Sequence, residues 1–313
     1  MGGMMTVYKN RIVNAPSESH DLVFYKDFGA SRVYSELNEV RVDIVPKGRL
    51  KPFVQLAAVE QHYSEIRITS LPDIANSVET RGSSKLIYEF HSSDETVLAR
   101  ELDSLNISNL DEIRVPSEFL AGLVHSLISG DASEIVRVYP NLVDNSIFSA
   151  EGPSGSWGLP AGQRPLVWVG RFDKGKNYRD FVRALSLLGP EFVGVVVVSM
   201  EDSPDRMATF LADASAYKVQ NRVHLLMNLS PDEIASLYRH ASNAQGCFVS
   251  TSLGESFGYG VAESMASGLP AVAYSVGALE ERAADEGHLI LVPVGDIHAL
   301  ASAISASSIS MAR

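Results

Sequence analysis

The sequence is poor in cysteine. Cys247 is the only one among 313 residues. A disulfide within the chain is therefore excluded, and nothing in the cysteine usage points to an oxidising compartment. Cys247 lies in an apolar run, so we interpret it as a small buried hydrophobic residue.

Long hydrophobic runs are also lacking. The longest runs from Phe192 to Met200 and has the length of a strand, whereas a membrane-spanning helix needs ~20 apolar residues. The first residues, Met-Gly-Gly-Met-Met-Thr-Val-Tyr-Lys-Asn-Arg, do not show the charged region followed by an apolar region that marks a signal peptide. The sequence therefore predicts a soluble, cytoplasmic protein.

Basic residues are outnumbered, with 26 Lys and Arg against 38 Asp and Glu and a formal net charge of −12. This balance argues against a nucleic-acid partner and against attachment to a membrane surface by bulk positive charge. An anionic ligand would need a local cluster of basic side chains. The hydrophobic content of 45% is sufficient for sizeable cores, and the length is typical of two domains.

Strand-like and helix-like segments alternate along the chain, which predicts α/β domains with largely parallel sheets. We expect an N-terminal domain over residues 1–148, a linker rich in Gly, Pro and Ser over 149–164, and a C-terminal domain over 165–313. Ligands of such domains bind at the carboxyl ends of the strands, here in a cleft between the domains. The expected N-terminal elements are strands 21–25, 40–45, 65–69, 85–90, 112–115 and 135–139, and helices 4–13, 56–63, 95–105 and 119–128. The expected C-terminal elements are strands 166–169, 193–198, 223–226, 247–249, 271–274 and 289–292, and helices 178–188, 205–216, 232–241, 259–267 and 297–306.

The stretch 249–275 is the most informative one. A buried strand leads into a loop that contains glycines, a helix follows over 259–267, and Gly268 and Pro270 end that helix before the next strand. A helix that begins beneath such a loop offers free N–H groups and a positive dipole end to an anion such as a diphosphate. Glu255 in the loop and Glu263 in the helix could each accept hydrogen bonds from sugar hydroxyls. The simpler alternative is an acidic helix start with solvated glutamates.

A second loop, Gly170-Arg-Phe-Asp-Lys-Gly-Lys-Asn177, also lies between a buried strand and a helix. Its Arg171 and Lys176 supply a planar guanidinium and an ammonium, which can clamp a diphosphate without a metal ion. The alternative is a solvated basic turn. Because the same domain provides the helix-terminus anion site, we favour the clamp.

Two weaker signals lie in the N-terminal domain. His91 follows a strand, at the edge expected to face the cleft, although a histidine there is more often structural. The residues Gly2 and Gly3 precede a helix and could let the backbone approach a phosphate. The sequence shows neither a Gly-x-Ser-x-Gly nucleophile elbow nor a metal-spaced cluster of His, Cys and Asp.

These motifs resemble a known family. The two glutamates with seven residues between them, followed by Met265-Ala-Ser-Gly-Leu-Pro-Ala-Val, resemble the E-x7-E signature of the retaining GT-B glycosyltransferases of family 4. Four further segments resemble that family, namely the 169–176 loop, the Pro140-Asn-Leu-Val-Asp turn, the segment 111–118 and Phe90-His-Ser. The resemblance is specific over 165–299, moderate over 85–148 and weak over 21–84.

The resemblance implies a GT-B fold, in which two Rossmann-like α/β domains face a deep cleft. It implies transfer of a hexose from a nucleotide-sugar, UDP- or GDP-linked, to an acceptor hydroxyl, with retention at the anomeric carbon and without a metal or other cofactor. The acceptor would be a sugar, a lipid-linked molecule or a small molecule, and a homo- or hetero-oligomer is compatible with this interpretation.

The resemblance also implies individual roles. Glu255 would contact the donor sugar and stabilise the reacting centre, and Glu263 would bind the ribose hydroxyls. Arg171 and Lys176 would neutralise the leaving diphosphate. His91, the second catalytic residue, would form a hydrogen bond near the donor sugar or the reacting centre. The backbone N–H groups around Phe257, Gly258 and Tyr259, and at the N-terminal glycine pair, would complete the donor site.

The chain departs from the family pattern in three places. Leu142 replaces a glycine of the turn. The sequence begins at the first glycine loop, so the central strand that precedes this loop in the family is missing, which would leave a gap in the sheet. The family also continues with a helix after the point where this sequence ends. These departures motivate the alternative of a non-catalytic GT-B subunit that binds or stabilises a partner transferase.

Overall fold

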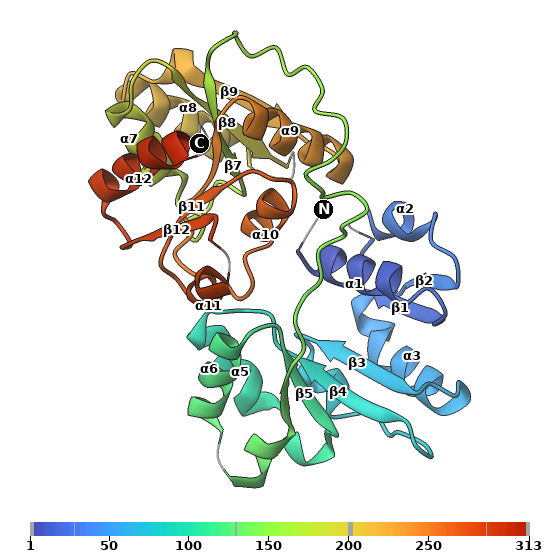
Figure 1. The fold of residues 1–313 in the computed structure, drawn as a ribbon. Helices are drawn as coiled ribbons and strands as arrows, with labels where there is room; N and C mark the ends of the chain where they lie inside the picture. Colours follow the sequence, from blue (N-terminus) through green and yellow to red (C-terminus); the bar gives the residue numbers. More distant parts are fainter. Residues whose placement is uncertain (1–2, 28, 129, 200–202, 286, 311–313) are drawn as a thin grey trace. The chain divides into compact units, whose positions relative to one another are not determined.

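The computed structural model describes residues 3–310 except 28, 129, 200–202 and 286, and it consists of two compact units (Figure 1). Unit 1 is Met1–Leu142 and unit 2 is Val143–Arg313. The division lies six residues before the end of the expected N-terminal domain, because Val143 and Ile147 pack against the core of unit 2. Among the described residues, no helix has both the length and the apolar character that crossing a membrane requires.

Unit 1 alternates strands and helices, and all its strand pairs are parallel. Its elements are α1 (Gly3–Asn14), β1 (His20–Phe24), α2 (Ala30–Tyr34), β2 (Val40–Ile44), α3 (Lys47–Glu60), β3 (Glu65–Thr69), α4 (Pro72–Ala75), β4 (Lys85–Glu89), α5 (Glu95–Ser104), β5 (Glu112–Val115), α6 (Glu118–Leu127) and β6 (Val136–Val138). The strands form two separate sheets, one of β1 and β2 and one in the order β3-β4-β5-β6. A hydrogen bond of 2.6 Å, donated by the Tyr63 hydroxyl to Asp21 Oδ2, links the beginnings of the two sheets.

The four-stranded sheet has two unlike faces, because side chains alternate along each strand. Apolar residues such as Ile68, Tyr88 and Ile113 point to one face, where α3, α4, α5 and α6 bury them in a common core. The opposite face bears charged residues, Glu65 and Arg67 on β3, Glu89 on β4, and Glu112 and Arg114 on β5. Helix α1 places Tyr8 and Arg11 against this charged face.

Unit 2 contains one six-stranded parallel sheet. Its elements are β7 (Arg164–Val169), α7 (Tyr178–Leu187), β8 (Phe192–Val198), α8 (Pro204–Ala216), β9 (Val223–Met227), α9 (Pro231–Asn243), β10 (Cys247–Ser250), α10 (Tyr259–Ala266), β11 (Ala271–Tyr274), α11 (Ala278–Asp285), β12 (Leu289–Val292) and α12 (Ile297–Ser310). The central strands β7, β8 and β10 are almost continuously apolar, as expected for strands covered on both faces. Cys247 is fully buried among them.

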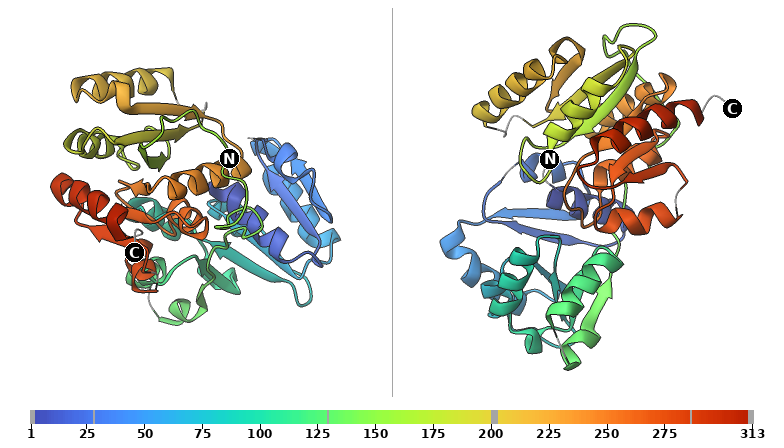
Figure 2. Two further views of the ribbon diagram at one scale, coloured as in Figure 1. Left: turned by 45° about the horizontal axis from the view of Figure 1, so that its top comes forward. Right: turned by 90° about the vertical axis from the view of Figure 1, so that its left-hand side faces the viewer.

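The strand order β12-β11-β10-β7-β8-β9 reverses direction between β10 and β7. Helix α7 packs against α8 and α12, whereas α9 packs against α10, so the two sets of helices cover opposite faces of the sheet (Figure 2). Parallel sheets of this kind leave a crevice outside the carboxyl ends of the two strands at the point of reversal. The loops that follow β7 and β10 are therefore the candidate ligand-binding loops of unit 2.

The segment expected as a linker contains no helix or strand over 149–163. It nevertheless packs against unit 2, because the buried Arg239 guanidinium on α9 donates hydrogen bonds to the carbonyls of Ile147, Ser149 and Pro153 at 2.8–3.2 Å. The Gly-rich segment is therefore an extended chain that packs on α9, not a flexible linker.

Most expected elements are confirmed to within four residues at each end. The side chains of Asp94 and Ser117 cap the N-termini of α5 and α6. The expected start of α3 is wrong by nine residues, since the helix begins at Lys47 and includes Pro52. Helices α2, α4 and α11 were not expected. The first two are short, and α11 is rich in charged residues, so none gives a strong apolar period.

The close contact between Gly246 and the backbone of β7 provides a test of the packing in unit 2. A Cβ atom added at Gly246 would lie 2.0 Å from the Pro165 carbonyl oxygen. We expect Gly246→Ala to lower the free energy of unfolding by roughly 3 kcal/mol, because a backbone atom must move. Gly122→Ala is the control. This glycine lies inside α6 with nothing within 4 Å of the added atom, so alanine should stabilise the helix by up to about 1 kcal/mol. Denaturant unfolding measures both, and an unaffected Gly246→Ala chain would contradict the described packing.

Candidate functional site

Two loops at the strand-order reversal of unit 2 form the candidate site. The first, 170–177, connects β7 to α7, and the second, 251–258, connects β10 to α10. The N–H of Leu253 donates to the Gly175 carbonyl at 2.8 Å, and the Thr251 hydroxyl donates to the Lys176 carbonyl at 3.0 Å. The indole of Trp168 on β7 donates to Thr251 Oγ1 at 3.2 Å. The two loops are thus fixed to each other and to the sheet.

Two of the expected site residues meet across these loops. Lys176 Nζ lies 2.5 Å from Glu255 Oε1, and the side chains are only 33% and 15% exposed. The backbone carbonyl of Glu255 also accepts the N–H of Ala278 at the start of α11. A charge-assisted pair in a partly buried position is stronger than one on the surface. The sequence placed both residues in the site but did not predict this contact, because nearly eighty positions separate them.

The beginning of α10 is open to an anion. Its N-cap, Gly258, makes no side-chain capping bond and has φ of +79°, a left-handed conformation that suits glycine. A Cβ atom there would lie 2.5 Å from Leu279 Cδ2, so a larger residue would also collide with α11. The first turn of α10 contains no acidic residue that could occupy the N–H groups. The helix dipole and these N–H groups therefore favour a negatively charged ligand at this point.

Two aromatic residues, Phe257 and Tyr259, flank Gly258 at the start of α10. The rings of Phe257 and Tyr259 lie 4.8 Å apart in an edge-to-face arrangement. The Arg282 guanidinium lies 4.8 Å from the centre of the Phe257 ring, a cation–π distance. Arg282 belongs to α11 and was not among the expected site residues. The loop Ser275-Val-Gly-Ala after strand β11 was the available signal, because it also ends at the carboxyl edge of the sheet.

Glu263 lies on α10, in the second turn of the helix. None of the described residues donates a hydrogen bond to its carboxylate, and burial raises the pKa of this group to about 8. The Tyr238 hydroxyl on α9 is buried, and it has no hydrogen-bond partner within the part of the chain that the structure describes. Burial and the neighbouring charge of Glu263 raise the pKa of Tyr238 well above its usual value. The site thus holds a carboxyl group with unused hydrogen-bonding capacity, which keeps its proton up to about pH 8.

Arg171 lies in the first loop but is 72% exposed, and its Nε donates to Asp173 Oδ2 at 2.9 Å. The second oxygen of Asp173 accepts the N–H of Lys176 at 2.9 Å, so Asp173 shapes the loop from within. The structure therefore places Arg171 at the expected edge of the sheet. Its guanidinium contacts Asp173 in the same loop.

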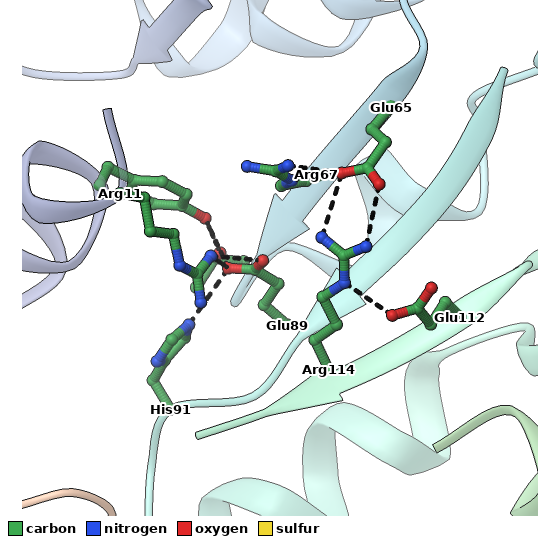
Figure 3. A network of polar contacts seen from close by, with 9 residues as sticks. Arg11, Glu65, Arg67, Glu89, His91, Glu112 and Arg114 are labelled. Atoms are coloured by element: carbon green, nitrogen blue, oxygen red, sulfur yellow. Dashed lines mark hydrogen bonds and ion pairs between the residues drawn. The ribbon is translucent and has the colours of Figure 1, made fainter. Parts of the chain in front are cut away.

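The remaining expected residues belong to unit 1. His91 follows β4, and its Nε2 lies 3.2 Å from Glu89 Oε2 (Figure 3). Gly3 is the first residue of α1, and Gly2 lies outside the described residues. Within the part of the chain that the structure describes, no group of three or more His, Cys, Asp or Glu could hold a metal ion.

Comparison with known proteins finds a family match within unit 2. The model of the family described as "Glycosyl transferases group 1" matches residues 163–307, which is nearly the whole of this unit. A 2-deoxystreptamine N-acetyl-D-glucosaminyltransferase of Streptomyces fradiae is 31% identical over 150 residues, 47% of this chain and 34% of that protein. An N-acetyl-alpha-D-glucosaminyl L-malate synthase of Bacillus anthracis is 26% identical over 223 residues, 68% of this chain and 55% of that protein. The chain thus aligns with about a third and about half of the lengths of these two relatives.

Solved structures show the fold of the whole chain. A crystal structure of Anabaena HepE in complex with UDP and glucose has a TM-score of 0.81 at 16% identity, covering 99% of this chain and 88% of that one. Sucrose-phosphate synthase from Thermosynechococcus elongatus has a TM-score of 0.76 at 20% identity, covering 97% and 84%. The chain therefore has the GT-B fold, with two Rossmann-like α/β units. The family match and the two relatives support a glycosyltransferase.

The raised pKa of Glu263 predicts how the stability depends on pH. Between the ordinary value of 4.5 and about 8, the folded chain holds a proton on Glu263 that the unfolded chain has lost. Stability from this group therefore falls as the pH rises through that range, by at most about 1.4 kcal/mol per unit. We expect Glu263→Gln to gain stability relative to the wild type between about pH 5 and pH 8, with no further gain above. Urea unfolding at a series of pH values measures this difference, and a constant difference would contradict the described burial.

Proposed function

We propose that the protein is a retaining glycosyltransferase that transfers a hexose from a nucleotide-diphosphate sugar to an acceptor hydroxyl without a metal ion. The observation that carries this proposal is the arrangement at the strand-order reversal of unit 2. There, Lys176 and Glu255 meet beside the uncapped start of α10. This arrangement combines a cation, N–H donors and a carboxylate where a diphospho-sugar needs each of them.

The diphosphate would bind at the start of α10, with its charge balanced by the N–H groups of the first turn and by Lys176. Entry of the diphosphate beside Lys176 would loosen the contact of this side chain with Glu255 and release the carboxylate toward the donor sugar. Arg171, which is exposed in the same loop, would turn from Asp173 to the outer phosphate. The cations would take the role that a divalent metal has in other transferases.

The nucleoside would extend along α10 to Glu263. Paired ribose hydroxyls would donate hydrogen bonds to its carboxylate, which has no other donor among the described residues. The names of both relatives include an N-acetylglucosaminyl group, and HepE was crystallised with UDP and glucose. UDP-N-acetylglucosamine and UDP-glucose are therefore the first donors to test, with the GDP-linked sugars next.

In the reaction, the acceptor oxygen would form a bond to the anomeric carbon while the bond from that carbon to the diphosphate oxygen breaks. The acceptor proton would pass to the departing diphosphate, so charge and atoms balance without an added reactant. An anomeric centre with oxocarbenium character and a departing anion are both stabilised by fixed charges of opposite sign. Glu255 would stabilise the anomeric centre. Lys176 and the N-terminus of α10 would stabilise the departing diphosphate.

The direct test combines binding, slow donor hydrolysis and transfer. We expect purified protein to bind at least one nucleotide-sugar by calorimetry and to hydrolyse it slowly. NMR of the first-formed product should show the anomeric configuration of the donor. Inversion would contradict the retaining mechanism, and failure to bind any UDP-, GDP- or ADP-sugar would contradict the whole proposal. Binding without hydrolysis or transfer to any acceptor would instead support a non-catalytic GT-B subunit that assists a partner transferase.

Substitutions of Lys176 and Glu255 are expected to change different kinetic parameters. Glu255→Gln keeps the shape but removes the charge beside the reacting centre, so we expect kcat to fall on the order of 10²- to 10³-fold. Lys176→Met removes a diphosphate contact and should mainly weaken donor binding, about tenfold or more. Initial rates at a series of donor concentrations separate the two effects.

The control for these variants is Arg179→Ala, which breaks an exposed ion pair with Asp213 in the same unit. Such surface pairs contribute about 0–1 kcal/mol, so its kinetics should match the wild type. Wild-type transfer by Glu255→Gln would rule out the role given to that residue.

Glu263 also predicts how donor affinity depends on pH. Ribose hydroxyls that donate to the carboxylate would lower its pKa in the complex, so binding below about pH 8 releases a proton. We expect UDP-sugar affinity to rise with pH, by up to about tenfold per unit, and to level off above about pH 8. Calorimetry in buffers of different ionisation enthalpy counts the released proton. The Glu263→Gln chain should bind more weakly at pH 8 and show no slope, and an equal slope in both chains would exclude Glu263 as its source.

A further inference from the structure

Helix α7 of unit 2 contains a buried carboxylate, Asp180, to which the proposed reaction gives no role. It lies in the first turn of the helix, four residues after Lys176. Only 6% of Asp180 is exposed. A charged side chain is costly to bury unless it is paired and hydrogen-bonded. The partners of Asp180 therefore show what its burial achieves.

Three side chains from different parts of unit 2 donate hydrogen bonds to Asp180. The Asn177 amide donates to Oδ2 at 2.7 Å, and the Tyr274 hydroxyl donates to the same oxygen at 2.8 Å. The Arg183 guanidinium donates to Oδ1 at 2.9 Å and balances the charge. Both oxygens of the carboxylate are thus occupied, and its position is fixed from three sides.

Tyr274 fixes Asp180 relative to the sheet. It is the last residue of β11 and is fully buried. Burial and the hydrogen bond to Asp180 raise the pKa of Tyr274 above its usual value, so its hydroxyl keeps the proton that it donates. Because β11 is parallel to β10 and pairs with it, the end of β11 lies at the same edge of the sheet as the two site loops.

Asn177 has a backbone conformation that needs support. It is the N-cap of α7, with φ of +48° and ψ of +49°, in the left-handed region. For residues other than glycine this region is disfavoured, on the order of tenfold in population, although asparagine tolerates it better than most. Among the described residues of α7, the Asn177 side chain caps no N–H group and instead donates to Asp180. This hydrogen bond stabilises the left-handed turn.

The conformation of Asn177 decides where the preceding residue, Lys176, points. The N–H of Lys176 donates to Asp173 Oδ1 at 2.9 Å, and its carbonyl accepts the Thr251 hydroxyl at 3.0 Å. From this position its ammonium reaches Glu255. An extended backbone at Asn177 would turn the loop 170–177 relative to α7 and would move that ammonium away from the start of α10.

We propose that Asp180 is a positioning residue for the donor site: by accepting the Asn177 amide it holds the end of the loop 170–177 in the left-handed turn that directs Lys176 to the diphosphate. This inference rests on the proposed function, in which Lys176 binds that diphosphate, and every residue that it uses belongs to unit 2. Without Asp180, only a fraction of the molecules present Lys176 correctly, and the apparent donor affinity falls by that fraction.

The alternative is that Asp180 only fastens α7 to β11, and a second substitution separates the two roles. We expect Asp180→Ala to weaken UDP-glucose binding about tenfold, measured by calorimetry on the full chain. Adding Asn177→Gly should restore the affinity to within about threefold of the wild type, because glycine adopts the left-handed backbone without support. Asn177→Gly restores no bond to Tyr274 or Arg183. If Asp180 only fastened the helix, the affinity would therefore stay low. If the wild type binds another nucleotide-sugar instead, that donor replaces UDP-glucose.

A double-mutant cycle tests whether the effect of Asp180 passes through Lys176. In the Lys176→Met chain there is no ammonium to direct, so adding Asp180→Ala should weaken binding by less than about twofold. An equal loss in both backgrounds would contradict the positioning role. Arg222→Met is the matched control, since Arg222 donates to the carbonyls of Leu185 and Gly189 at the other end of the same helix. We expect this variant to lose stability while it binds the donor as the wild type does.

Substitutions of Asn177 keep the proposal testable if Asp180→Ala does not fold. Asn177→Ala should bind the donor about tenfold more weakly than Asn177→Gly, and equal affinities would overturn the proposal. If the wild type binds UDP-glucose and Asp180→Ala binds it equally well, the positioning role is wrong and the transferase stands. If the wild type binds no nucleotide-sugar, the proposed function itself fails, and the role of Asp180 fails with it.

Discussion

The ion pair between Lys176 and Glu255 is the contact on which the account of unit 2 depends. The two residues come from loops that follow β7 and β10, the neighbouring strands at which the sheet order reverses. Backbone bonds from Leu253 to Gly175 and from Ala278 to Glu255 hold the loops at the distance that this pair requires. A cation and a carboxylate held together beside an uncapped helix start form a site that is charged on both sides and ready for a ligand with complementary charges.

The two units use charge differently. In unit 2 the N-cap of α10 is a glycine, which has no capping side chain, and none of the described residues donates a hydrogen bond to the carboxyl group of Glu263. In unit 1 the carboxylate of Glu89 is fully satisfied by Arg11, Tyr8 and His91. Unsatisfied buried polar groups cost stability unless a ligand completes them. Satisfied networks instead make the position of one side chain definite. The first condition suits binding of a ligand, and the second fixes the position of a side chain within unit 1.

The sequence was sufficient for the class of fold and for the positions of the two loops that form the candidate site of unit 2. Strands such as Cys247–Ser250 are apolar throughout, and Gly258, Gly268 and Pro270 mark the limits of α10 by local chemistry alone. Contacts between distant residues could not be predicted in this way. Nothing local to Glu255 indicates that Lys176 is its partner, and nothing local to Arg282 indicates that it stacks on Phe257.

Glu89 shows why the polar network of unit 1 was missed. It stands in the run Lys85-Leu-Ile-Tyr-Glu, where a charged residue at a strand end normally faces solvent. Its burial depends on Arg11, 78 positions earlier, and therefore on the packing of α1 against the sheet. Helices α2, α4 and α11 were missed for a related reason, since tertiary packing rather than an apolar period stabilises them.

Hydrogen–deuterium exchange of the full chain, with and without a saturating UDP-sugar, tests the central claim most directly. The account predicts slower exchange in the loops 170–177 and 251–258 and in the first turn of α10, where ligand oxygens would occupy the N–H groups. It predicts no comparable change at the far edge of the same sheet, in β9. Unchanged exchange in both loops, under conditions in which calorimetry shows the donor bound, would contradict it.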